Sequence, residues 1–349
     1  MENIALIDSF SEFKDMKSID RVTLMSILEE VFRAALNRKF GSDENFDIII
    51  NPDKGDLEIW RNRVVVADDE VEDDNEEIEL SVARKIEPDF EIGEDVSEEV
   101  KLYDLGRRAI LALRQNLISK IQEHDSTNIF KHFKELEGDI YSAEVHHIRH
   151  NAIILLDDDG NEIVLPKSEQ IRSDFFRKGD SVRGVIKTVE LRGNKPAIIL
   201  SRTSPDFLVK LFEQEIPEVF DGLITVERVA RIPGEKAKVA VDSYDDRIDP
   251  VGACVGMKGS RIHGIVRELG NENIDVINYT NNTQLFITRA LSPAKVNSLN
   301  IDEEKKTVQV YLNPDEVSRA IGKGGHNIRL AGRLTGYEID VYREGAEEM

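Results

Sequence analysis

The sequence predicts a multidomain α+β protein on three observations. Long amphipathic helices alternate with strand-like segments in the first third of the chain, and five short strands separated by turns follow. A segment in which two glycines flank a lysine then occurs twice, starting at Gly256 and Gly322, 66 positions apart, each time before a helical pattern and a strand. With 349 residues, of which 40% are hydrophobic, the chain can form about two to four compact cores.

Two long amphipathic helices are expected to bound an N-terminal α/β domain over residues 1–125. Asp20 is a suitable N-cap for a helix from Val22 to Phe40, because its side chain can accept hydrogen bonds from the first free N–H groups. Gly41 is suited to end that helix, and a second helix is expected from about residue 100 to 123. Between the helices the sequence predicts strands over residues 46–50, 57–67 and 79–86, with a solvated acidic loop over 68–79.

The next 78 residues, 126–203, have the pattern of a small all-β domain. Five short strands with clear turn residues between them suit a closed barrel, so we expect an OB-type (S1) β-barrel here. Tyr141, Phe175 and Phe176 are its candidates for stacking on RNA bases, which is few for that role, so its share in RNA binding stays open. The strands are expected over residues 138–147, 151–156, 162–166, 181–191 and 197–201.

The repeated glycine segment is the most informative motif. Gly256-Met257-Lys258-Gly259 and Gly322-Lys323-Gly324-Gly325 each follow an apolar residue and open a helical pattern. Glycine lets another backbone approach closely, the first turn of the helix offers free N–H groups and a positive dipole end, and the lysine adds a charge. KH domains use such a loop to grip the backbone of a single strand. A nucleotide P-loop does not fit, because no Ser or Thr follows either lysine.

The first glycine segment stands in the order helix, two strands, helix, glycine turn, helix and strand, and the second is preceded by a predicted strand over residues 307–312 and followed by a helix and a strand. This order is that of the prokaryotic-type KH fold, which we expect twice in tandem, over residues 204–291 and 292–349. In the first copy a helix is expected to end before Pro217, and strands are expected over residues 219–231 and 236–242.

The net charge of −22 at first argues against nucleic-acid binding, but the charges are unevenly distributed. Residues 1–125 carry 32 acidic and 16 basic side chains, whereas residues 251–343 carry 10 acidic and 12 basic ones. Basic side chains therefore gather around the glycine turns, where phosphates would bind. The acidic first third suits a protein partner with a basic surface, or serves solubility alone, and both interpretations stay open.

Composition also indicates where the protein acts. No apolar run is long enough to span a bilayer, and the segment from Met1 to Ile4 lacks the start of a secretory signal. The single Cys254 cannot form an internal disulfide, and its neighbours Gly252, Ala253 and Val255 predict a small buried residue. We therefore expect a cytoplasmic protein with no membrane contact.

An acidic helix-bounded domain, an S1 barrel and two KH domains together resemble the bacterial NusA family of transcription elongation and termination factors. The most specific match is the stretch from Asp249 to Ile262, which is similar to the first KH signature of that family. The resemblance implies a monomeric regulator without catalysis, whose N-terminal domain docks on RNA polymerase while the barrel and KH domains receive nascent single-stranded RNA. It also implies effects on pausing, intrinsic termination and antitermination, with other antitermination factors as further partners.

The resemblance assigns RNA contacts to the two glycine turns and their flanks. Arg107 and Arg108, on the second predicted helix, are expected either to contact the polymerase or the transcript or to be merely solvated. The RNA-binding candidates are Gly256, Met257, Lys258, Gly259, Arg261, Gly322, Lys323, Gly324, Gly325, His326 and Arg329.

Two other classes of function remain open. An exoribonuclease with S1 and KH modules would need a large phosphorolytic core, for which residues 1–125 are too few, so no catalytic residue or cofactor is expected. His146, His147 and His150 invite a zinc interpretation, but adjacent strand residues point to opposite faces and the barrel has no cysteine, so no metal is expected. A ribosome-associated or RNA-processing binding module would share the C-terminal domains and lack the polymerase contact.

Overall fold

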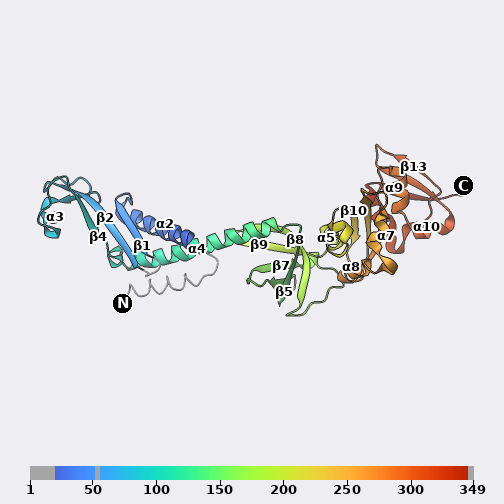
Figure 1. The fold of residues 1–349 in the computed structure, drawn as a ribbon, viewed down its shortest axis with the longest axis horizontal. Coiled ribbons are helices and arrows are strands. Elements are labelled where there is room, and N and C mark those ends of the chain that lie inside the picture. The colour runs from blue at the N-terminus through green and yellow to red at the C-terminus, as the bar shows by residue number, and fades with distance from the viewer. Residues whose placement is uncertain (1–19, 52–55, 345–349) are drawn as a thin grey trace. The chain divides into compact units, whose positions relative to one another are not determined.

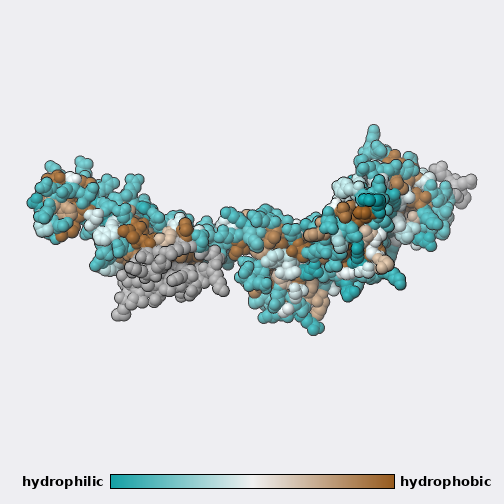
Figure 2. All heavy atoms as spheres, viewed as in Figure 1, coloured by the Kyte–Doolittle hydropathy of each residue, from teal (hydrophilic) through white to brown (hydrophobic). Residues whose placement is uncertain are grey.

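The computed structural model describes residues 20–51 and 56–344 of the chain. The chain divides into two compact units, Met1–Ile129 and Phe130–Met349, and each unit is described by itself. Figure 1 labels the helices and strands, and Figure 2 shows that hydrophilic residues cover most of the visible surface. None of the described helices combines the length and the apolar character that crossing a membrane requires.

In the first unit, α2 (Arg21–Phe40) confirms the first predicted helix together with both of its ends. The Asp20 carboxylate accepts hydrogen bonds from the backbone N–H groups of Val22 and Thr23, at 2.9 and 3.0 Å. These bonds satisfy two of the free donors at the start of the helix. Gly41 ends the helix with a φ of 88°, in the left-handed region that glycine adopts readily.

The sheet of the first unit is built around β2 (Asp56–Val66). β1 (Phe46–Asn51) and β4 (Asp95–Glu99) pair with it antiparallel, and β3 (Glu77–Glu79) pairs with it parallel. The strands predicted over residues 46–50 and 57–67 are therefore confirmed. The core forms between this sheet, α2 and α4 (Arg107–Glu135), and its buried side chains are Ile27, Leu28, Val31, Phe32, Leu36, Phe46, Ile59, Leu105, Leu113, Leu117 and Ile121.

The strand predicted over residues 79–86 is wrong, because α3 (Leu80–Ile86) occupies this segment directly after β3. Apolar residues do alternate here, but the packing does not follow the alternation. Ala83 is fully buried against side chains of β2, β3 and β4, whereas Val82 and Ile86 are exposed. A helical turn is what directs Ala83 toward this small cluster, so strand pairing is limited to the last three residues of the predicted acidic loop.

The second long helix begins and ends later than predicted. Leu102–Leu105 form the 3₁₀ helix η1, and Gly106 has a φ of 83° and a ψ of 151°, which interrupts the backbone before α4 begins at Arg107. α4 then continues to Glu135, so the predicted domain boundary between residues 125 and 126 falls inside a helix.

In the second unit, five strands form a closed sheet in the order β5-β6-β7-β9-β8. Neighbouring strands are antiparallel except β7 and β9, which are parallel. These are the five strands that the sequence predicted, with ends shifted by a few residues. Their bounds are β5 (Ile140–Ile148), β6 (Ala152–Leu156), β7 (Glu162–Pro166), β8 (Ser181–Arg192) and β9 (Lys195–Ser201).

Two copies of one topology follow the closed sheet, here called the first and the second repeat. In each, the central strand pairs antiparallel with the strand before it and parallel with the strand after it. The first repeat comprises α5 (Pro205–Glu215), α6 (Pro217–Phe220), β10 (Ile224–Ile232), β11 (Lys236–Ser243), α7 (Pro250–Val255), α8 (Ile262–Glu268) and β12 (Asn273–Asn278). The second comprises α9 (Thr283–Ala290), β13 (Ser298–Asp302), β14 (Thr307–Leu312), α10 (Pro314–Ile321), α11 (His326–Thr335) and β15 (Glu338–Arg343).

Two details of the repeats differ from the prediction. The strand expected to begin at residue 219 begins at Ile224, because Pro217–Phe220 form the short helix α6. Helix α9 was not predicted, although Asn282 caps it by accepting a hydrogen bond from the N–H of Leu285 at 2.9 Å. Since Phe286 of α9 packs in the core of the second repeat, the predicted boundary between residues 291 and 292 cuts this repeat.

The two repeats share a packed interface. β11 is buried on both faces, since Val239 packs in the core of the first repeat and Ala240 packs against side chains of the second. Arg228 of β10 donates from Nη1 to the carbonyls of Leu334 and Thr335, at 3.2 and 3.3 Å. These carbonyls lie at the C-terminal end of α11, where a cation is favoured by the helix dipole. The two repeats therefore form one packed body.

The closed sheet is joined to the first repeat by one buried guanidinium. Arg202 is 5% exposed, and it donates to Asp174 Oδ2 at 2.8 Å and to Glu268 Oε1 at 2.9 Å. Its ring neighbours are Phe176 and Phe207, whose centroids lie 5.4 and 5.5 Å from the guanidinium carbon. Because Asp174 precedes β8 and Glu268 ends α8, this cluster holds the two parts in one arrangement.

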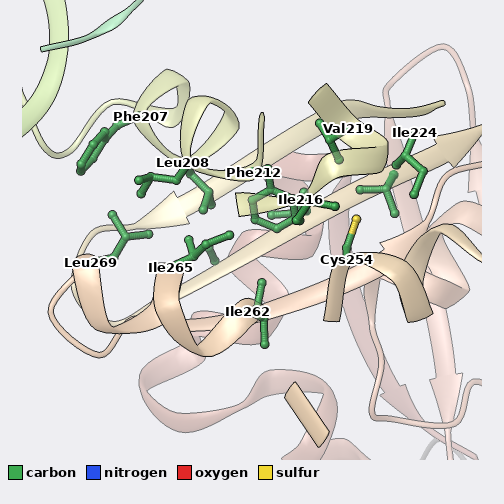
Figure 3. Close-up of a cluster of buried hydrophobic side chains, with 14 of the residues drawn as sticks. Phe207, Leu208, Phe212, Ile216, Val219, Ile224, Cys254, Ile262, Ile265 and Leu269 are labelled. Carbon is green, nitrogen blue, oxygen red and sulfur yellow. The ribbon is translucent and has the colours of Figure 1, made fainter. Parts of the chain in front are cut away.

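Cys254 lies in the core of the first repeat. Figure 3 shows side chains of α5, such as Phe212, facing side chains of α8, such as Ile265, with Cys254 beside them. The residue is fully buried, which confirms the sequence prediction, and burial raises the pKa of its thiol to about 12.

We expect iodoacetamide to modify Cys254 at pH 8 at least about a hundredfold more slowly in the native chain than in urea. The reagent attacks the thiolate, which a raised pKa keeps scarce, whereas an unfolded cysteine has a pKa of about 8.5. Mass spectrometry at timed quenches measures both rates. Equal rates would contradict the buried position.

Candidate nucleic-acid interface

The two glycine loops have the same backbone path, which supports the repeat found in the sequence. Gly256 has φ and ψ of 74° and 169°, and its counterpart Gly322 has 73° and 172°. Two positions later, Lys258 has 53° and 29°, and Gly324 has 60° and 19°. The lysines therefore stand at different positions, since Lys258 is the third residue of its loop and Lys323 the second of its own.

The first glycine of each loop is required by both conformation and space. A φ near 74° with a ψ near 170° lies in a region that only glycine adopts readily. A Cβ at Gly256 would lie 2.9 Å from the Oγ of Ser260, and a Cβ at Gly322 would lie 2.7 Å from the Cβ of Asn327. The loop thus folds back onto the first turn of the following helix.

Substituting asparagine at Gly322 is expected to lower the free energy of unfolding by about 2–3 kcal/mol, because the side chain would be both strained and obstructed. The same substitution at Gly325 is expected to cost less than about 1 kcal/mol. Gly325 has φ and ψ of 71° and 15°, a left-handed conformation that asparagine tolerates, and no atom lies within 4 Å of its Cβ position. Urea denaturation of both variants measures the difference, and equal losses would contradict the assigned role of Gly322.

The residue five positions after each first glycine braces the loop from behind. Arg261 donates from Nη1 to the carbonyl of Ala253 and to Glu218 Oε2, both at 2.8 Å. Asn327 donates from Nδ2 to the carbonyls of Arg319 and Ala320, at 3.3 and 3.2 Å. In both repeats the carbonyl acceptors belong to the helix before the loop, whose last carbonyls otherwise lack partners, whereas Glu218 lies on α6.

The charged side chains of the loops face solvent. Lys258 and Lys323 are exposed, and among the described residues neither has a carboxylate within ion-pair distance. Met257 is 88% exposed beside Lys258, and Arg329 is exposed on α11. His326 is half-buried at the start of α11. The loops therefore present cations on glycine-rich backbone, a surface that suits the phosphates of a single strand.

The other predicted pair, Arg107 and Arg108, belongs to the first unit. Both residues are exposed in the first turn of α4, and Arg114 is exposed further along the same helix. Leu111, which is 60% exposed, lies between them in sequence. Three exposed arginines and one exposed leucine therefore lie within residues 107–114, in a unit whose composition is otherwise acidic.

Sequence reasoning missed the residues that support the loops. It placed Arg261 among the RNA contacts, whereas its guanidinium is engaged by Glu218, 43 positions earlier in the chain. Hydrogen bonds from its own backbone and from Arg261 hold the pKa of Glu218 below its usual range. Asn327 directly follows the predicted contact His326, and nothing in the sequence indicated that it supports the loop. Pairs this distant in sequence leave no periodic pattern.

The fold and the two loops define a protein of the tandem KH class. Family models agree: the NusA N-terminal domain matches residues 5–127, the NusA-like first KH domain residues 202–279, and the NusA-like second KH domain residues 283–349. The chain belongs to the NusA family.

Curated relatives support this membership over almost the whole chain. The transcription termination/antitermination protein NusA of Halalkalibacterium halodurans is 35% identical over 348 residues, covering 99% of this chain and 90% of the relative. The proteins of the same name from Thermus thermophilus and Bacillus subtilis are 33% and 34% identical, covering 97% of this chain and 90% and 91% of the relatives. The solution structure of the N-terminal domain of NusA from Bacillus subtilis matches 35% of this chain and 98% of that structure, with 26% identity and a TM-score of 0.26.

Proposed function

We propose that this protein is an RNA-binding transcription factor that docks on RNA polymerase and on the nascent transcript, where it modulates pausing, intrinsic termination and antitermination. The observation that carries the proposal is the pair of glycine loops, which share one backbone path and each expose a lysine. The relatives, named transcription termination/antitermination proteins, support it. In this proposal the protein acts in the cytoplasm as a monomer, without a catalytic residue, cofactor or metal, and together with other antitermination factors.

We propose a division of labour along the chain. Residues 1–125 bind the polymerase, with Arg107 and Arg108 as contacts to the polymerase or to the emerging RNA. Residues 126–203 form an S1 domain of the OB type, which the closed sheet with its parallel pair of β7 and β9 supports. The KH domains bind RNA through Gly256–Gly259 and Gly322–Gly325.

A pause assay on a hairpin-pause template with the cognate RNA polymerase tests the proposal, alongside co-elution of the chain with core polymerase. The wild-type chain should lengthen the pause and co-elute. The K258D/K323D variant should still co-elute but lose most of the pause effect, and the R107E/R108E variant maps the contact in the first unit. A chain that binds RNA yet neither co-elutes nor lengthens the pause would overturn the proposal and indicate an RNA-binding module of another machine.

A further inference from the structure

The sheet of the second repeat, β13-β14-β15, carries two stacked tyrosines, Tyr311 and Tyr342, on the face opposite its helices. We infer that this face, here called the tyrosine face, binds a segment of a partner protein that presents arginine side chains. The inference goes beyond the RNA-binding function proposed above, because this surface lies apart from the glycine loops and bears the opposite charge.

Strand pairing determines which side chains make up the tyrosine face. Successive residues of a strand point to opposite faces of the sheet, and Val308, Val310 and Leu312 of β14 are buried in the core of the second repeat. The residues between them, and the residues paired with those on β13 and β15, therefore face outward. None of these nine side chains is fully buried. In three paired rows they are Ser298, Tyr311 and Tyr342, then Asn300, Gln309 and Asp340, then Asp302, Thr307 and Glu338.

The tyrosines form the aromatic end of this face. The ring centroids of Tyr311 and Tyr342 lie 5.5 Å apart, with 27° between the ring planes, and Tyr342 is 42% exposed. The negative face of an aromatic ring attracts a cation, and a planar guanidinium can stack on it. Asp340 precedes Tyr342 by two residues on the same face of β15. An arginine stacked on Tyr342 is therefore within reach of the carboxylate of Asp340.

The first repeat shows what Asp340 lacks. Asp275 of β12 occupies the register position that Asp340 occupies in β15. Lys236 and Lys238 of β11 both donate to Asp275 Oδ2, at 2.8 and 3.0 Å. The equivalent residues of β14 are uncharged, and no cation lies within ion-pair distance of Asp340 in the part of the chain that the structure describes. A partner's arginine would supply the charge that the two lysines supply in the first repeat.

The same face of the first repeat is already an interface. Ala240 and Ile277, which are 0% and 8% exposed, pack there against side chains of the second repeat. Their register equivalents in the second repeat are Tyr311 and Tyr342, which reach solvent. The position at which the first repeat is covered is thus occupied in the second repeat by an accessible aromatic pair, which is the kind of side chain enriched at protein interfaces.

Charge selects the kind of partner. The nine residues of the tyrosine face include three carboxylates and neither lysine nor arginine. Asp302 is paired with Lys305 at 3.6 Å, whereas Glu338 and Asp340 have no ion-pair partner among residues 20–51 and 56–344. This charge repels the phosphates of RNA and favours a cationic protein segment. Arginine fits better than lysine, because its planar group can stack on a ring and pair with a carboxylate at the same time.

The test titrates the full-length chain with a defined probe, a peptide of about 12 residues in which arginine and serine alternate, long enough to cross the three strands. The Y342S/D340N variant should bind this peptide about tenfold more weakly, because the stacking surface and the carboxylate are both removed. The Y244S/D246N variant is the matched control, since it removes one exposed tyrosine and one exposed carboxylate from the first repeat. It should change the affinity less than about twofold, because distant surface charges are screened. A peptide with lysine in place of arginine should bind the wild-type chain more weakly.

A direct readout comes from a photo-reactive benzoylphenylalanine placed at position 342, which should cross-link to the arginine peptide, whereas the same group at position 244 should not. Circular dichroism checks that both double variants are folded. If Y342S/D340N binds the peptide as tightly as wild type, the inference fails. If Y342S/D340N instead loses affinity for single-stranded RNA, or loses a concentration-dependent dimer in sedimentation, the occupant is RNA or a second copy of the chain, and the inference is overturned. The function of the glycine loops is tested separately by K258D/K323D.

Discussion

Replacing Lys258 and Lys323 together with aspartate is expected to weaken binding to single-stranded RNA by about a hundredfold at moderate salt. Each lysine is exposed on glycine-rich backbone, and a charge-assisted hydrogen bond to phosphate contributes about 1.5–3 kcal/mol. Losing two phosphate contacts should also reduce the slope of log K against log salt by about 1.4. Fluorescence anisotropy titrations at several salt concentrations measure both quantities, and the loss should extend to every RNA sequence tested.

The matched control carries the same change in charge at two lysines away from the loops. Lys195, at the start of β9, and Lys305, between β13 and β14, are both exposed, and their joint replacement with aspartate should reduce affinity less than about threefold. An equal loss in the control would show that overall charge, and not the loops, governs binding. Unchanged affinity of K258D/K323D at low salt would refute the clamp.

Glu272→Ala is expected to lower the free energy of unfolding of the second unit by about 3–5 kcal/mol, because it leaves a buried guanidinium unpaired. Arg231 and Glu272 are 1% and 0% exposed, and two hydrogen bonds of 2.8 Å join them. Glu272 also accepts a hydrogen bond from the N–H of Gly234 at 2.9 Å. Urea denaturation followed by circular dichroism measures the loss, and hydrogen exchange of β10, β11 and β12 locates it.

Two further variants separate burial from ion pairing. Arg247 and Asp245 are joined by a similar two-bonded contact, but their side chains are 89% and 33% exposed, so Asp245→Ala should cost less than about 1 kcal/mol. The R231M/E272L variant, which removes both charges, should recover most of the loss. If Glu272→Ala costs no more than Asp245→Ala, the buried pair does not hold this repeat together.

The sequence alone determined those elements whose type and ends depend on neighbouring residues. Asp20 and Gly41 define the ends of α2, because a cap and a left-handed glycine act within one helical turn. The strands of the closed sheet and the glycine loops were likewise predictable, since periodicity, turn composition and an internal repeat are all visible in the sequence. Local signals failed at two elements. At α3, alternating apolar residues suggested a strand, and β4 was not predicted, because its sequence is acidic and only Val96 is buried.

Only the tertiary structure decided which residues from distant parts of the chain contact one another. The charge of Arg261 was visible in the sequence, but its partner Glu218 lies on another helix, so its bracing role emerges only from packing. β11 is buried on both faces because the second repeat covers the face that the first repeat leaves open, which no pattern within β11 records. The exposure of Phe175 arises in the same way, since its neighbour Phe176 is engaged by Arg202, which lies beyond β9. Contacts between residues far apart in the chain depend on the assembled fold. These contacts determine whether a side chain is solvated, supports the structure or is available for binding.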